Sequence, residues 1–104
     1  MTGPDLAVAR RVVVEMVRLA AIEVPGVVRI RRGGRGWAAW LGRSPVKVRI
    51  RDGQVEARVW VVARPGQAIV PLAQEVRMAV AAAIERLLDM EVRDVTVVVD
   101  GVGA

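Results

Sequence analysis

The sequence contains no histidine, cysteine, tyrosine or phenylalanine. Without a thiol or an imidazole the chain cannot form a Ser–His or Cys–His nucleophile pair, a disulfide, or a metal site built on those ligands. Hydroxyl side chains are limited to Thr2, Ser44 and Thr96. We therefore expect a protein that is not an enzyme, with no catalytic residue, no bound metal and no cofactor.

Acidic residues are the remaining candidates for chemistry, and they are few. Asp89, Glu91 and Asp94 fall together in the sequence, between a predicted helix and a predicted strand. Such a group could hold a cation weakly, but an ordinary acidic turn explains it better. The sequence gives no other grouping of carboxylates that would suggest acid–base catalysis.

Long apolar runs are also absent, although the hydrophobic fraction is 54% over 104 residues. A helix that crosses a membrane needs about 20 consecutive apolar residues, and the N-terminus lacks the basic-then-apolar pattern of a signal peptide. The length fits one domain, residues 1–104. With only three aromatic residues, all Trp, the core is expected to consist of Val, Ala, Leu, Ile and Met.

Positive charge is concentrated in residues 29–51. This segment has eight of the 16 Lys and Arg residues and none of the 11 Asp and Glu residues, whereas the chain as a whole has a net charge of +5. A local cluster of one sign indicates a surface that meets an anionic partner. The cations are Arg29, Arg31, Arg32, Arg35, Arg43, Lys47, Arg49 and Arg51.

The periodicity of apolar residues predicts two helices and four strands. Helical spacing covers residues 6–22 and about 67–88, and alternation or short apolar runs cover the strands. The order α-β-β-β-α-β predicts an α+β fold, with an antiparallel-rich sheet and both helices packed on one face. The expected strands are 27–32, the two arms of a hairpin within 46–63, and 92–99.

The hairpin has a defined register because Asp52-Gly53 is typical of a two-residue turn. This turn places Ile50 opposite Val55 and Arg49 opposite Glu56, so that apolar residues pair with apolar ones and polar residues with polar ones. A shift of one residue would destroy that match.

The face of the sheet away from the helices is expected to be cationic. Arg29 and Arg31 should share one face of the first strand, and if the two sets coincide they join the polar face of the hairpin. An apolar cluster beside these cations suggests a partner interface, unless a loop or a terminus covers Trp60. The polar face of the hairpin comprises Lys47, Arg49, Arg51, Glu56, Arg58 and Arg64, and the apolar cluster comprises Trp60, Val62 and Val98.

The loop between the first two strands has two possible roles. Residues 33–36, Gly-Gly-Arg-Gly, resemble a single RGG element that follows a phosphate backbone, or form a flexible connector. Trp37, Trp40 and Leu41 would share one face of a helical turn, which either closes the end of the core or contacts a membrane interface or a protein.

Several connecting segments resemble the alkaline shock protein family of bacterial envelope stress response proteins. The first helix ends in Glu-Val-Pro-Gly-Val at residues 23–27, and Leu-Gly-Arg at 41–43 precedes the alternating strand. Ile-Val-Pro at 69–71 opens the second long helix. Glu91-Val92 then leads into the last strand and Gly101-Val102. The likeness covers about residues 6–102.

The resemblance implies a small cytoplasmic α+β protein with no established activity or cofactor, and some members sit at the membrane by binding a membrane-anchored protein. We therefore expect a scaffold or adaptor at the inner face of the cell membrane, which contacts a protein partner and can form a homo-oligomer. The alternatives are a nucleic-acid-binding module that uses residues 29–51 and direct contact with anionic lipid. The residues predicted to bind the partner are Arg29, Arg31, Arg32, Arg35, Trp37, Trp40, Lys47, Arg49, Arg58 and Trp60.

Overall fold

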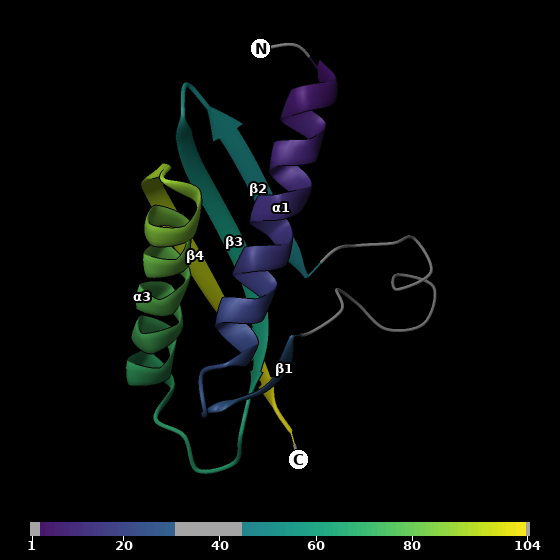
Figure 1. Cartoon of the computed structure of the whole chain (residues 1–104). Helices are drawn as coiled ribbons and strands as arrows, with labels where there is room; N and C mark the ends of the chain where they lie inside the picture. The colour runs from purple at the N-terminus through teal and green to yellow at the C-terminus, as the bar shows by residue number, and fades with distance from the viewer. Residues whose placement is uncertain (1–2, 31–44, 104) are drawn as a thin grey trace, which may run out of the picture.

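The computed structural model describes residues 3–30 and 45–103, with side chains described from residue 7 onward. Two long helices and four strands follow one another in the predicted order (Figure 1). The elements are α1 (Gly3–Ile22), β1 (Val27–Ile30), β2 (Val46–Arg51), β3 (Gln54–Ala63), α3 (Ile69–Leu88) and β4 (Glu91–Val102).

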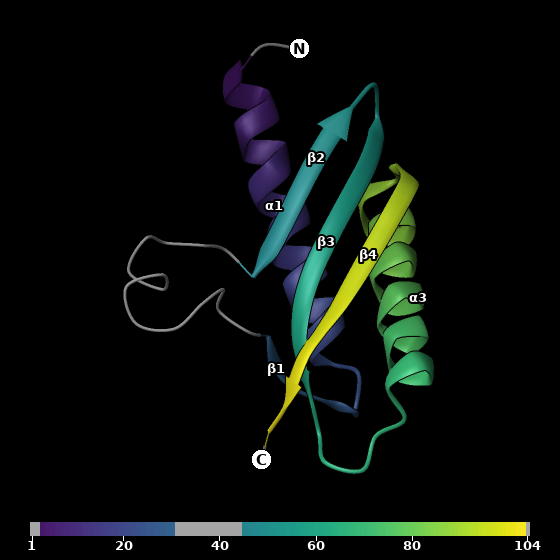
Figure 2. The same ribbon diagram turned by 180° about the vertical axis from the view of Figure 1, so that it is seen from behind.

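Both helices lie on the same face of the sheet, as predicted. Figure 1 shows α1 and α3 in front of the strands, and Figure 2, from behind, shows the strands with no described helix in front of them. The molecule therefore has two layers: a helical layer over one side of the sheet, and an opposite side that the described helices leave open.

β3 is the central strand. β1 and β2 pair with it antiparallel along the same edge, β2 with residues 54–59 and β1 with residues 61–63. β4 pairs with the other edge in the parallel direction. Two of the three pairings are antiparallel, so the antiparallel-rich sheet of the sequence prediction is confirmed.

The β2–β3 hairpin has the register that the turn predicts. Ile50 lies opposite Val55 and Arg49 opposite Glu56. Asp52 and Gly53 have φ values of 53° and 74°, and two successive residues with positive φ are typical of the type I′ turn that joins twisted strands.

The core lies between the helices and the sheet, and its buried residues are aliphatic. Alternate residues of β3 point into it, from Val55 to Ala63, and meet α3 at Leu72, Val76 and Val80. This arrangement follows from the two periods: every second residue of the strand and every third or fourth residue of the helix face the same layer. Trp60 has the opposite parity in β3, and it is not part of the core cluster.

The first helix begins earlier than the sequence suggested. The helical spacing predicts a start at residue 6, but α1 starts at Gly3. Farther along, Arg18 donates hydrogen bonds to the Glu15 carboxylate on the exposed side. These hydrogen bonds hold the pKa of the Glu15 carboxyl below its ordinary value.

Gly26, between α1 and β1, lies in a tightly packed position. Its carbonyl accepts a hydrogen bond from the Arg64 amide at 2.8 Å. A Cβ at this position would lie 2.5 Å from Oε1 of Gln67 and 2.6 Å from Cδ1 of the buried Leu72. The backbone is thus held close to the start of α3, with no room for a side chain.

Replacing Gly26 with alanine is expected to lower the free energy of unfolding by about 1–3 kcal/mol, because buried Leu72 must shift to make room. Urea denaturation followed by circular dichroism measures this change. Gly53→Asn is the control: its site has open space and Asn tolerates positive φ, so the change should stay below about 1 kcal/mol. Equal effects of the two substitutions would contradict the close packing at Gly26.

Candidate functional site

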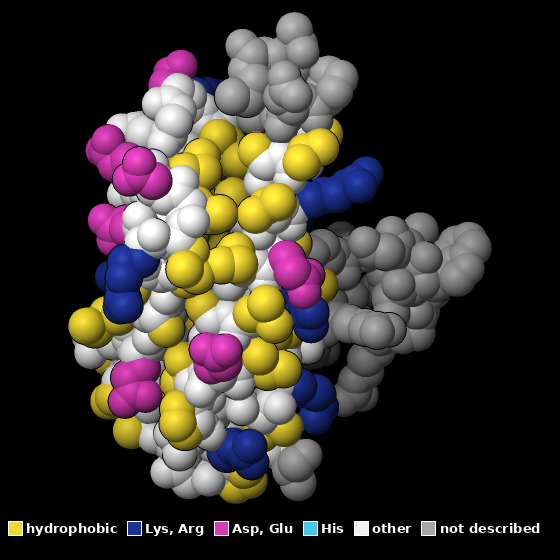
Figure 3. Space-filling model, in the orientation of Figure 1, with side chains coloured by type: hydrophobic (Ala, Val, Ile, Leu, Met, Phe, Trp, Pro, Cys, Tyr) yellow, Lys and Arg dark blue, Asp and Glu magenta, His cyan; other side chains and the backbone are white. Residues whose placement is uncertain are grey.

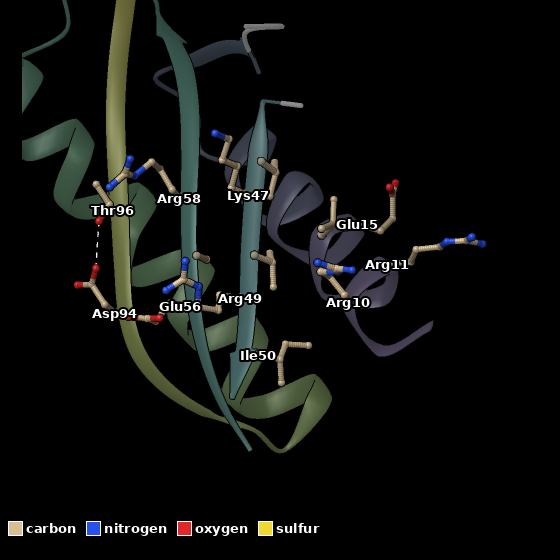
Figure 4. Close-up of a pocket in the computed structure, with 14 residues that line it drawn as sticks. Arg10, Arg11, Glu15, Lys47, Arg49, Ile50, Glu56, Arg58, Asp94 and Thr96 are labelled. Carbon is tan, nitrogen blue, oxygen red and sulfur yellow. Dashed lines mark hydrogen bonds between the residues drawn. The ribbon is translucent and has the colours of Figure 1, made fainter. Parts of the chain in front are cut away.

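The open face of the sheet brings together side chains from β2 and β3. The antiparallel register places Lys47 opposite Arg58 and Arg49 opposite Glu56, all with the parity that points away from the core. Figure 4 shows these side chains with β2 and β3. We use the name cationic face for Lys47, Arg49, Arg51, Arg58 and Trp60.

Trp60 lies close to two cations of this face. The Lys47 Nζ is 5.8 Å from the centre of the indole ring, and the Arg58 Cζ is 6.0 Å from it. Cations at such distances are attracted to the ring electrons, which offsets part of the repulsion between the facing Lys47 and Arg58. Trp60 is half-buried, so part of the ring remains open to a partner.

The acidic residues that lie near the cationic face in the described structure do not form ion pairs with its cations. Glu56 lies opposite Arg49, and Asp94 of β4 lies beside Glu56, where it accepts a 3.0 Å hydrogen bond from the Thr96 hydroxyl. Within the described part of the chain, however, no carboxylate comes within 4.0 Å of Lys47, Arg49 or Arg58. These three cations are therefore available to external anions.

Arg29 and Arg64, two predicted cations near β1, lie apart from the cationic face and contact other segments. Arg29 pairs with Val62 across β1 and β3, and a Cβ on Gly103 would lie 3.5 Å from its guanidinium. Arg64 donates a 2.8 Å hydrogen bond from Nε to the Pro25 carbonyl. Arg64 therefore fixes the turn before β1, whereas Arg29 is on the same side of the sheet as the cationic face but near the C-terminal segment.

Half of the predicted partner-binding residues belong to the part of the chain that the structure describes. The structure brings together Lys47, Arg49, Arg58 and Trp60, and puts Arg29 on the same side. The other five lie outside the described residues, and their part in a binding surface stays a prediction: Arg31, Arg32, Arg35, Trp37 and Trp40.

A groove of about 1110 Å³ extends from Asp94 and Thr96 of β4 across β3 and β2 to α1 (Figure 4). Arg10 and Arg11 of α1 join Lys47, Arg49 and Arg58 in its lining, and Val14 adds an apolar contact. Arg10 and Arg11 were not among the predicted residues, because their place beside β2 depends on how α1 crosses the sheet and not on a local sequence pattern.

The helical layer has an apolar surface that the sequence analysis also missed. Hydrophobic side chains are spread along the helices in the space-filling view (Figure 3). On α1, Val8 is 61% exposed, and Val12, Leu19 and Ile22 are each more than 40% exposed. Their spacing of three, four or seven residues places them on one side of the helix, a pattern that the sequence shows once the buried side is known.

No metal centre or membrane-spanning helix is found where the structure is described. Among the described side chains, those of residues 7–30 and 45–103, no three acidic groups gather as a metal ion would require. Over the same residues, neither helix combines the length and the apolarity needed to cross a membrane.

Comparison with known proteins identifies a family and several solved structures that this chain resembles. The sequence model of the alkaline shock protein family matches residues 4–104. The family is described as having a cell envelope-related function. No curated protein sequence matches the chain significantly.

Among solved structures, variants of a protein called MamM CTD have the same fold. One variant has 18% identity and a TM-score of 0.62, covering 93% of this chain and 99% of that one. A zinc form of another variant has 18% identity and a TM-score of 0.61, covering 93% and 90% of the two chains. At this level of identity the likeness establishes the fold and not the function.

Proposed function

Because the chain belongs to the alkaline shock protein family, whose function is related to the cell envelope, we propose that it is a non-enzymatic adaptor at the cytoplasmic side of the cell membrane. The adaptor docks on an anionic region of a protein partner, and the cationic face is the surface that makes this contact. The partner, rather than the chain itself, is anchored in the membrane.

One observation supports this proposal above the others: the cationic face is exposed and without ion pairs in the described part of the chain. Lys47, Arg49 and Arg58 have no carboxylate within 4.0 Å there. Unpaired surface cations accelerate encounter with an anionic partner and restrict which partners bind. Half-buried Trp60 adds a large, partly apolar contact at one end of the cationic face, beside Lys47 and Arg58, and tryptophan is enriched among residues that dominate binding energies.

The arrangement suits a protein partner better than a single-stranded nucleic acid. A nucleic-acid platform stacks successive bases on several aromatic side chains. In the described strands, Trp60 is the single aromatic residue, so the face offers one stacking position among charged side chains.

Fractionation of cells after alkaline shock tests the proposal. We expect the protein in the envelope fraction, cross-linked to a membrane protein, and released by salt because the contact is electrostatic. A wholly soluble pool with no cross-linked membrane protein would contradict the proposal. Recovery of the chain with RNA that dissociates steeply as salt rises would favour the nucleic-acid alternative.

A further inference from the structure

The outer edge of β2 is a strand edge to which no described strand pairs. The Trp60 amide donates to the Pro45 carbonyl at 3.0 Å, which identifies residues 45 and 60 as a hydrogen-bonded pair. Since such pairs alternate along an antiparallel ladder, the backbone N–H and C=O groups of Lys47, Arg49 and Arg51 form hydrogen bonds with β3. The N–H and C=O groups of Val48 and Ile50 therefore point to the outer edge, away from β3.

The two sides of this edge differ in chemistry. Toward the open face, Lys47 and Arg49 extend from β2 into the groove. Toward the helices, half-buried Val48 and Ile50 lie in the same groove with half-buried Val14 of α1. A strand added here would place alternate side chains against cations and the intervening ones against an apolar strip.

A second copy of β2 fits this edge poorly. If two β2 strands paired antiparallel about Val48 or Ile50, the cations of one copy would lie opposite the cations of the other, because residue parity is kept across a sheet. Like charges directly opposite one another are destabilising. If the added strand is acidic, its carboxylates lie opposite the β2 cations and attract them.

We propose that β2 accepts an extended acidic segment of a protein partner as an additional strand of the sheet. The segment alternates carboxylate side chains, which meet Lys47 and Arg49, with aliphatic ones, which meet Val14, Val48 and Ile50. Its backbone hydrogen bonds to the outward groups of Val48 and Ile50, the mode known as β-strand addition. This inference rests on the proposed docking function and names the partner's chemistry and its place of contact.

Binding of a synthetic peptide tests the inference directly. The probe is a soluble eight-residue peptide that alternates Glu and Val, followed by fluorescence anisotropy and by amide hydrogen exchange of the whole protein. We expect saturable binding, with slower exchange at the Val48 and Ile50 amides. The same peptide with Lys in place of Glu is the charge control, and a peptide N-methylated at the residues that would bond to β2 is the backbone control. Each control is expected to bind at least about tenfold more weakly.

Val48→Pro tests the edge from the side of the protein. Proline removes the outward amide but none of the β2–β3 hydrogen bonds, and edge strands tolerate it at such positions. We expect the affinity for the acidic peptide to fall at least about tenfold, while the circular dichroism spectrum is retained. The N-methylated peptide keeps the test valid if this variant folds poorly.

Three results would overturn the inference. The acidic peptide could bind without protecting the Val48 and Ile50 amides, the same amides could become protected by self-association of the chain, or vesicles of phosphatidylglycerol could bind where the peptide does not. If the peptide binds without protecting these amides, the cationic face still binds an acidic partner, and only the strand-addition inference is contradicted. If cross-linking after alkaline shock finds no membrane protein at all, the proposed function fails, whatever the peptide does.

Discussion

Leu72→Ala is expected to lower the free energy of unfolding by about 2–5 kcal/mol. Leu72 is 1% exposed, near the start of α3, and lies in the core cluster with the buried residues of β3. Truncation removes three carbon atoms from a core built of aliphatic side chains, and no large ring is available in that cluster to collapse into the space. The cavity cost therefore adds to the lost transfer free energy.

Chemical denaturation of the purified protein measures this effect, and Leu87→Ala is the matched control. The control residue has the same side chain in the same helix but is 64% exposed, so its loss should change stability by less than about 0.5 kcal/mol. If both variants lowered the free energy of unfolding equally, Leu72 would not be packed between α3 and the sheet.

Reversal of two charges on the cationic face, Arg49→Glu with Arg58→Glu, is expected to weaken binding to the proposed envelope partner by at least about a hundredfold. Each reversal replaces an attraction with a repulsion, and we take roughly 1.4 kcal/mol for each position, which is tenfold in affinity. The two residues lie on neighbouring strands of the same face, so both act on one anionic surface.

The control is Arg77→Glu with Arg86→Glu, which changes the net charge equally on the exposed side of α3. Binding to immobilised wild-type and variant proteins from detergent-solubilised envelope is compared at two salt concentrations. The control should bind within about threefold of wild type, since surface charges far from an interface act only through screened long-range fields. If both double variants lost the same affinity, the net charge of the protein, and not the cationic face, would explain the effect.

The sequence was sufficient for most of the fold because its patterns are local and consistent. The Asp52-Gly53 turn fixed the hairpin register, and alternation from Val46 to Ala63 then determined which side chains face the core. The boundaries were less accurate: β4 extends to Glu91 and Val102, and α1 begins at Gly3. Element ends depend on pairing and packing partners more than on the local residues.

The candidate site could be predicted only in part. The parity of β2 and β3 correctly grouped Lys47, Arg49, Arg58 and Trp60, because parity within a hairpin is a local property. Arg10 and Arg11 enter the groove through the crossing of α1 over β2, and Arg64 is bonded to the Pro25 carbonyl. Such contacts join segments far apart in the sequence, and no periodicity shows them.

Amine labelling of Lys47 shows whether the partner docks on the cationic face. Lys47 is the single lysine of the sequence and lies on the cationic face beside Trp60. Its acetylation by an amine-reactive ester is quantified by mass spectrometry, for the free protein and for the protein bound to its envelope partner. We expect binding to slow the reaction of Lys47 several-fold. An unchanged rate in the fully bound protein would contradict docking on the cationic face, because the partner would then be docked elsewhere.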